Sequence, residues 1–241
     1  MSWRITIMMY RKKLLYVAIY AVGMAYLEAA IVVYLRRLYG ITDLMVSVPA
    51  FSPQISVIEV GREFATLVML LAVGLMSGKK LQSKIGFAIY AFGLWDIWYY
   101  VWLAVFIGWP TSLLDWDLLF LIPLPWWGPV ITPTMIAGLM VLCGSRLAAL
   151  EDKEIMIHPT KVDVLFLILG ICIMLYVFMA DAIAQLPASI EALGMLRPTS
   201  FLWQYYFIGY MLAVYAAWRM LVRQPRGKLS HKDLRKEDNV L

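Results

Sequence analysis

Charged residues are scarce in this chain, and their scarcity excludes a soluble globular fold. Only 15% of the 241 residues are charged and 63% are hydrophobic, with a mean hydropathy of +0.76, whereas soluble domains carry about 25% charged residues. At about 1.5 Å per helical residue, ~20 residues cross the ~30 Å hydrocarbon core of a bilayer. Six apolar stretches meet or approach that length: 14–36, 58–77, 85–108, 130–150, 162–186 and 201–222. The sequence predicts an all-α, polytopic membrane bundle of six transmembrane helices.

Histidine and cysteine are also scarce, with two residues of each. His158 and His231 lie in a predicted loop and in the tail, which excludes a bis-histidine haem within the membrane and metal sites built on helix histidines. Cys143 and Cys172 fall within apolar helices, where thiols are usually inert. We therefore expect no metal and no cofactor.

Basic residues are nearly missing from one side of the predicted bundle. When the connecting segments are assigned alternately to two sides, 17 of the 21 Lys and Arg residues fall with the N-terminus. This bias sets orientation, so both termini are expected in the cytoplasm. The basic residues then face anionic lipid headgroups, and no nucleic-acid partner is expected. Residues 1–222 form the single predicted domain, and 223–241 form a charged tail that we expect to be disordered.

The segment 111–129, between the third and fourth predicted helices, is too apolar for a free loop. It carries Asp115 and Asp117 but otherwise almost no charge, and its prolines exclude a spanning helix. We predict an interfacial or re-entrant segment, with a short helix in the outer interface followed by an extended return over the mouth of the bundle. Ser112-x-x-Asp115 resembles a capping box, so both acids are expected to stabilise the start of that helix.

Acidic residues lie inside the apolar segments, and only on the outer side. Glu28 lies 8 residues, or about 12 Å, from the outer end of its segment, and Asp96 lies 12 residues, or about 18 Å, from the end of its own. An Asp near the bilayer centre costs ~2.5–3.5 kcal/mol. Arg62 is the only base on that side which we expect a buried acid to reach easily. At least one acid should therefore be protonated, bound to a ligand or facing water.

The spacing of the polar residues places them on shared helix faces. On the second and third predicted helices they recur at positions i, i+3 and i+4, and neighbouring helices would bring these faces together. The candidate ligand-binding residues are Glu28, Glu59, Arg62, Glu63, Asp96, Tyr99 and Tyr100. If the last helix closes the bundle, it would add Gln204, Tyr205, Tyr206 and Tyr210. A structural ion pair around Arg62, and a single hydrogen bond made by Asp96, are the alternative interpretations.

Several short runs together resemble a group of uncharacterised bacterial multi-pass membrane proteins over roughly residues 14–140. They are Tyr-Leu-Glu-Ala-Ala-Ile-Val-Val-Tyr-Leu over 26–35, Glu-Val-Gly-Arg-Glu over 59–63, Trp-Asp-Ile-Trp-Tyr-Tyr over 95–100, Gly-Trp-Pro over 108–110 and Pro-Leu-Pro-Trp-Trp-Gly-Pro over 123–129. The resemblance implies a six-helix architecture in a bacterial inner membrane, and it carries no activity.

Three classes of function remain open. The first is a protein with an outward-facing carboxylate and aromatic cavity that binds, or transports, a small cationic or amphipathic ligand. The second is a non-catalytic scaffold or accessory subunit of a larger membrane complex, without its own haem or metal. The third is an intramembrane enzyme that modifies a lipid or isoprenoid with a carboxylate acid or base. We favour the first class and assign no catalytic residue; membrane lipids and membrane-protein subunits are the other expected partners.

Overall fold

The computed structural model describes residues 2–41, 45, 53–152, 155–187 and 196–223. In these ranges the chain forms six α-helices, a two-stranded hairpin and a π-helical turn. They are α1 (Ser2–Leu38), α2 (Pro53–Ser77), α3 (Leu81–Ile107), β1 (Trp116–Phe120), β2 (Trp126–Pro129), α4 (Ile131–Asp152), α5 (Lys161–Ala184), α7 (Trp203–Trp218) and the turn η1 (Arg219–Arg223). Each of the six predicted apolar segments is thus mainly helical. The predicted tail, from residue 224 on, lies outside the described residues.

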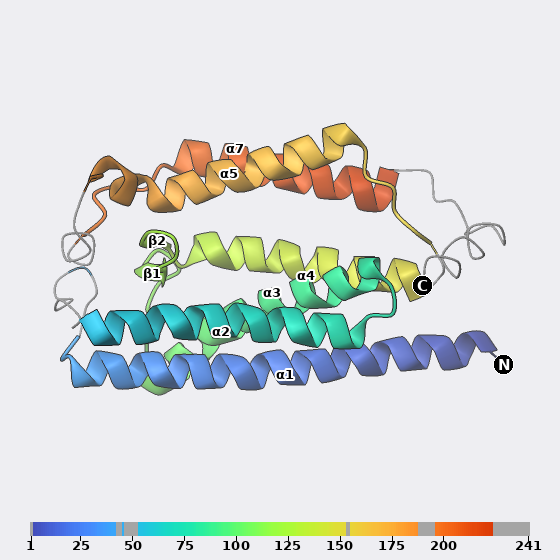
Figure 1. Cartoon of the computed structure of the whole chain (residues 1–241), viewed down its shortest axis with the longest axis horizontal. Coiled ribbons are helices and arrows are strands. Elements are labelled where there is room, and N and C mark those ends of the chain that lie inside the picture. Colours follow the sequence, from blue (N-terminus) through green and yellow to red (C-terminus); the bar gives the residue numbers. More distant parts are fainter. Residues whose placement is uncertain (1, 42–44, 46–52, 153–154, 188–195, 224–241) are drawn as a thin grey trace.

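The helices lie side by side along one long axis and alternate in direction, so that their connections gather at two ends (Figure 1). α3 packs against α1, α2 and α4, whereas α5 pairs mainly with α7. The end of the bundle that carries β1 and β2 is called the hairpin end below. α1 ends there, and α2 begins there.

Four helical segments are long and apolar enough to cross a membrane: Tyr10–Leu38, Leu81–Ile107, Ile131–Leu150 and Lys161–Ala184. Within the most apolar stretch of each of these helices, only 22 to 39% is buried inside the protein. Most of this apolar surface therefore needs an apolar surrounding, which is consistent with a membrane protein. α2 and α7 are not among the four; α7 has only 16 residues before it continues as η1.

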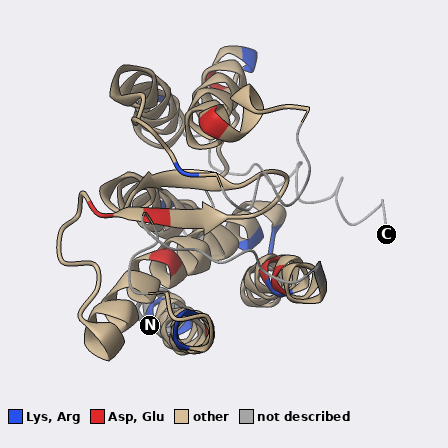
Figure 2. Ribbon diagram, turned by 90° about the vertical axis from the view of Figure 1, so that its left-hand side faces the viewer, with Lys and Arg blue, Asp and Glu red and all other residues tan. Residues whose placement is uncertain are grey.

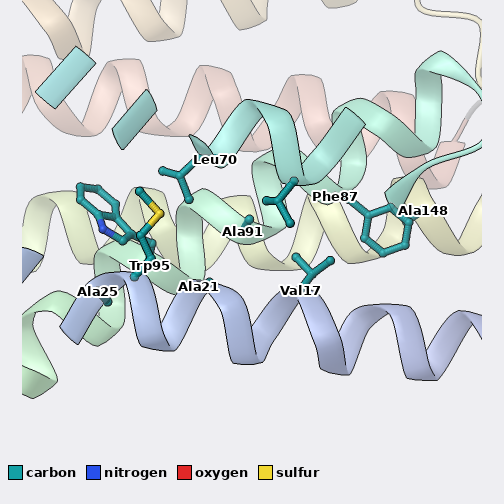
Figure 3. Packing of buried hydrophobic residues seen from close by; sticks show 10 residues of the cluster. Val17, Ala21, Ala25, Leu70, Phe87, Ala91, Trp95 and Ala148 are labelled. Atoms are coloured by element: carbon teal, nitrogen blue, oxygen red, sulfur yellow. The ribbon is translucent and has the colours of Figure 1, made fainter. Parts of the chain in front are cut away.

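Small residues allow α1 and α3 to pack closely. Ala21 and Ala25 of α1 and Ala91 of α3 are fully buried, and Trp95 of α3 and Leu70 of α2 belong to the same cluster (Figure 3). A stripe of alanines lets two helices approach within van der Waals contact, which matters most where lipid gives no hydrophobic driving force. The sequence's four-residue spacing of small residues on the first helix thus faces α3.

Glycine pairs serve the same purpose in the other helix contacts. A methyl group on Gly170 of α5 would lie 2.6 Å from the carbonyl oxygen of Gly209 in α7. A methyl group on Gly144 of α4 would lie 2.5 Å from the carbonyl oxygen of Gly86 in α3. The close packing of both helix pairs therefore requires glycine, which has no side chain, at these positions.

The prediction of a short interfacial helix after α3 is wrong, because the chain forms a β-hairpin there. β1 pairs with β2 in an antiparallel register that places Trp116 opposite Pro129 and Leu118 opposite Trp127. In an apolar setting every backbone N–H and C=O group needs a hydrogen-bond partner, and two paired strands provide these partners for each other. Asp115 caps no helix; its Oδ2 accepts the backbone N–H groups of residues 111 and 112 at 2.7 and 3.1 Å and so closes the turn before β1.

At the opposite end, one buried acid joins α5 to the end of α7. Asp163 is fully buried, and its Oδ2 accepts hydrogen bonds from the backbone N–H and the hydroxyl of Thr160 in a capping box. Its other oxygen, Oδ1, lies 2.6 Å from Nε of Arg219. The α5–α7 pair is thus fastened at this end by charge and along its length by the glycine contact.

Candidate functional site

A cavity of about 190 Å³ lies at the hairpin end, bounded by residues of α1, α2, α3, α4, α5 and the hairpin. Seen from this end, acidic and basic positions occur on the hairpin and on the helices around it (Figure 2). The cavity brings together all seven candidate residues predicted from the sequence: Glu28, Glu59, Arg62, Glu63, Asp96, Tyr99 and Tyr100. Gln204, Tyr205, Tyr206 and Tyr210 of α7 do not line it. The hydroxyls of Tyr206 and Tyr210 donate instead to the carbonyl oxygens of residues 132 and 135 in α4, at 2.7 and 3.3 Å.

Arg62 of α2 lies at the centre of an ion-pair cluster. Its Nη2 and Nε lie 2.8 and 2.9 Å from Oε2 of Glu59, one turn earlier on the same helix. Its guanidinium also pairs with Glu28 of α1, whose Oε2 accepts a hydrogen bond of 3.2 Å from the hydroxyl of Thr66. Both carboxylates are buried. The cluster therefore joins α1 to α2 while it lines the cavity.

Glu63, one residue beyond Arg62, attaches the hairpin to α2. Its two carboxylate oxygens lie 3.1 and 3.0 Å from the backbone nitrogen of Leu121, which donates the hydrogen bond. Leu121 directly follows β1, and Glu63 is only 7% exposed. A carboxylate that accepts a backbone N–H in a dry setting makes a strong, charge-assisted bond. The hairpin is thus held at its turn.

Arg36 and Asp117 form a second ion pair, which the sequence analysis missed. Nη2 of Arg36 lies 3.3 Å from Oδ1 of Asp117, and the guanidinium stacks 4.1 Å above the ring of Trp109. Arg62 is therefore not the only base that the buried acids reach. Because β1 pairs with β2, it turns Asp117 into the cavity, whereas the predicted helix would have left this acid at a helix start.

The burial of Asp117 has an electrostatic consequence. Its side chain is 3% exposed, and burial raises the pKa of this carboxyl to about 6, although the Arg36 guanidinium, the Tyr100 hydroxyl and the N–H of Leu118 act in the opposite direction. Desolvation disfavours the charged form of an acid, and the ion pair offsets only part of that cost.

Asp96 of α3 is the carboxylate that has no partner. Five acids line the cavity (Glu28, Glu59, Glu63, Asp96 and Asp117), together with two guanidinium groups. Arg62 pairs with two of the acids, Arg36 with one, and the hairpin backbone with another. Among the described residues, no side chain or backbone group forms a hydrogen bond or ion pair with Asp96. Asp96, which is half-buried, is thus the cavity acid left over when the other four have partners.

Aromatic rings form a continuous wall beside Asp96. The ring centroids of Trp95 and Phe120 lie 6.4 Å apart, and those of Phe120 and Trp126 lie 5.2 Å apart. The ring of Trp126 is nearly parallel to that of Phe178 in α5, with an angle of 2° and a centroid distance of 6.2 Å. Within the described ranges, the indole nitrogens of Trp95 and Trp126, Nε of Arg36 and Oδ2 of Asp117 are buried without a hydrogen-bond partner. All four belong to cavity residues, so the protein alone does not satisfy the polar lining of its cavity.

In the described part of the chain, no three His, Cys, Asp or Glu side chains converge in a way that could hold a metal ion. The five cavity acids are instead spread over α1, α2, α3 and β1. Comparison with protein-family models, curated proteins and solved structures gives no match for this chain. Its function must therefore be inferred from the residues that line the cavity.

Proposed function

We propose that this chain is a six-helix, multi-pass protein of a bacterial inner membrane that binds a small cation in the cavity at the hairpin end. The unpartnered carboxylate of Asp96 carries this proposal. A half-buried carboxylate in a largely apolar cavity is costly unless it is paired, protonated or hydrated. A cationic ligand would supply the missing partner.

The charge balance of the cavity favours a cation over an anion. Its lining holds five carboxylates and two guanidinium groups, and both guanidinium groups already contact carboxylates. An anionic ligand would meet a negative surplus with no free guanidinium. The aromatic wall adds to the preference, because the faces of Trp, Tyr and Phe rings attract cations.

The proposed orientation places the hairpin end outside the cell and both chain termini in the cytoplasm. Of the 15 Lys and Arg residues in the described ranges, only Arg36, Arg37, Arg62 and Arg197 belong to the segments or helix halves at the hairpin end, and the side poorer in Lys and Arg is normally the outer one. The cavity residues extend from the hairpin end to about the middle of the helices and no further. Binding therefore fits the cavity better than transport, which needs a continuous path.

The proposal is tested by measuring the thermal stability of the purified protein, in lipid nanodiscs, against small organic cations, inorganic cations, anions and neutral sugars. We expect at least one cation to raise the melting temperature of the wild type, and the effect to disappear in Asp96→Asn. Asp181→Asn is the matched control, because Asp181 is an acid on α5 that does not line the cavity.

Two outcomes would overturn the proposal. One is that no cation stabilises the wild type, while a partner protein co-purifies in a fixed ratio, which would support the scaffold function. The other is that Asp96→Asn responds to the cation as the wild type does. Native mass spectrometry of the gently purified protein identifies a retained small molecule or a partner in the same preparation.

A further inference from the structure

Asp96 and Asp117 both line the small cavity, from two different elements. Asp96 lies on α3 and Asp117 on β1. Asp117 is 2% exposed. Arg36 binds its Oδ1 and leaves its Oδ2 without a partner in the described part of the chain. Two carboxylates of like charge in one small, largely apolar cavity repel each other unless a cation or a proton lies between them.

We infer that the cavity holds a small primary ammonium compound, whose ammonium group bridges Asp96 and Oδ2 of Asp117. This inference rests on the proposed function and specifies its ligand. A primary ammonium carries three N–H donors on one nitrogen, as the lysine side chain does. Two of these donors meet the two carboxylates, and Tyr99 and Tyr100 lie beside them in the lining.

The rest of the lining suits a carbon skeleton and not a hydrated metal ion. Hard metal ions such as Mg²⁺ and Ca²⁺ take six or more oxygen ligands. Although several acids line the cavity, no three acidic side chains of the described residues lie together in a way that could hold a metal ion. The wall beside Asp96 consists instead of the rings of Trp95, Phe120 and Trp126. These rings supply apolar contact to the carbon atoms next to the ammonium group.

The size of the cavity restricts the ligand to a compact molecule. Its volume is about 190 Å³, whereas pockets for drug-sized ligands measure about 300–1,000 Å³. A long acyl chain would not fit within it. The expected ligand is therefore a short alkylammonium compound.

The test is isothermal titration calorimetry of the nanodisc-embedded protein at pH 7.5 with ethylammonium, tetramethylammonium, K⁺ and Mg²⁺. We expect ethylammonium to bind the wild type, and Asp96→Asn and Asp117→Asn each to weaken its binding roughly 10- to 100-fold, since each loses a charged hydrogen bond. Asp181→Asn should bind ethylammonium as the wild type does. Asp96→Asn decides the test if Asp117→Asn does not fold, because Asp96 has no partner to lose.

Tetramethylammonium separates this inference from the proposed function, because it is a cation without N–H donors. If it or K⁺ or Mg²⁺ binds as tightly as ethylammonium, and binding still requires Asp96, a cation site exists but the ammonium bridge is wrong. If no cation binds to the wild type, both proposals are wrong. If ethylammonium binds equally well to Asp96→Asn, its site lies elsewhere and the bridge is again wrong.

Discussion

Arg36, near the end of α1, holds Asp117 of the hairpin with its guanidinium 3.3 Å from the carboxylate. Glu63 of α2 binds the backbone of Leu121 at the other end of β1. The hairpin is thus fastened to two different helices by two charged contacts. These two contacts keep the hairpin in the position in which it forms one side of the cavity.

The first prediction concerns pH and Asp117. Because burial raises the pKa of this carboxyl from 3.8 to about 6, the folded state binds more protons than the unfolded state between these values. The free energy of unfolding therefore falls as pH rises from about 4 to about 6. At about 1.4 kcal/mol per pKa unit, the loss is about 3 kcal/mol, and Asp117→Asn should not show it. Thermal unfolding of both proteins from pH 4 to 8 measures the difference.

Asp115 serves as the control for this experiment, since its pKa moves in the other direction. Partial burial acts to raise the pKa of Asp115, but hydrogen bonds from Ser112 and Thr111 outweigh it and lower the pKa below its ordinary value. Its contribution to stability is present at neutral pH and is lost as pH falls through the lowered pKa. A difference between wild type and Asp117→Asn that does not change with pH would contradict the first prediction.

The second prediction is that Arg62→Ala destabilises the protein by about 3–5 kcal/mol, because it leaves Glu28 and Glu59 buried without a cation. Thermal or urea unfolding in a fixed detergent measures the loss. Arg37→Ala, at an exposed position on α1, should change stability by less than about 0.5 kcal/mol.

A neutralised variant tests whether the effect of Arg62 is electrostatic. Arg62→Met combined with Glu28→Gln and Glu59→Gln removes every charge of the cluster and should recover most of the lost stability. If the triple variant is as unstable as Arg62→Ala, the cluster acts through packing and the electrostatic explanation is wrong.

The third prediction concerns Glu63 and the attachment of the hairpin. Glu63→Ala removes the acceptor of the Leu121 N–H, a charged hydrogen bond worth about 1.5–3 kcal/mol. Hydrogen exchange at the Leu121 amide should become roughly 10- to 100-fold faster. Glu63→Gln keeps a carbonyl oxygen as acceptor and should show a smaller increase. Unchanged exchange in Glu63→Ala would mean that other contacts hold the hairpin.

The fourth prediction concerns the close contact between α5 and α7. Gly170→Ala places a methyl group 2.6 Å from the carbonyl oxygen of Gly209, so the helices must separate, at a cost of about 1–3 kcal/mol. Gly138→Ala in α4 is the matched control, because nothing lies within 4 Å of the added methyl group there. The control should be neutral or slightly stabilising, since alanine favours a helix over glycine. Equal melting temperatures for the two variants would contradict the close contact.

Much of the helical architecture could be predicted from the sequence, because apolar length and charge patterning are local signals. The helix faces that carry Arg62 and Asp96 could be predicted for the same reason, since the i, i+3 and i+4 spacing belongs to one helix. The structure brings these faces to one cavity. Whether the residues bind a ligand stays a prediction.

The hairpin and the Arg36–Asp117 pair could not be predicted, because both depend on contacts between distant segments. In β1 every residue except Asp117 is apolar, so no alternation of polar and apolar positions indicates a strand. Arg36 lies near the end of a helix, where a charged side chain usually faces water. Its partner becomes clear only when the strand pairing turns Asp117 inward.

In the described part of the chain, Phe178 is the one residue of the α5–α7 pair that lines the cavity. Its ring is parallel to the ring of Trp126. The ion pairs of Arg36 and Arg62 connect α1, α2 and the hairpin and do not involve the pair. An outward tilt of α5 and α7 as a unit would therefore open a side window at this stacked contact and leave both guanidinium clusters intact. Entry to the interior would then separate two aromatic faces and break the hydrogen bonds of Tyr206 and Tyr210 to α4, but no charge pair.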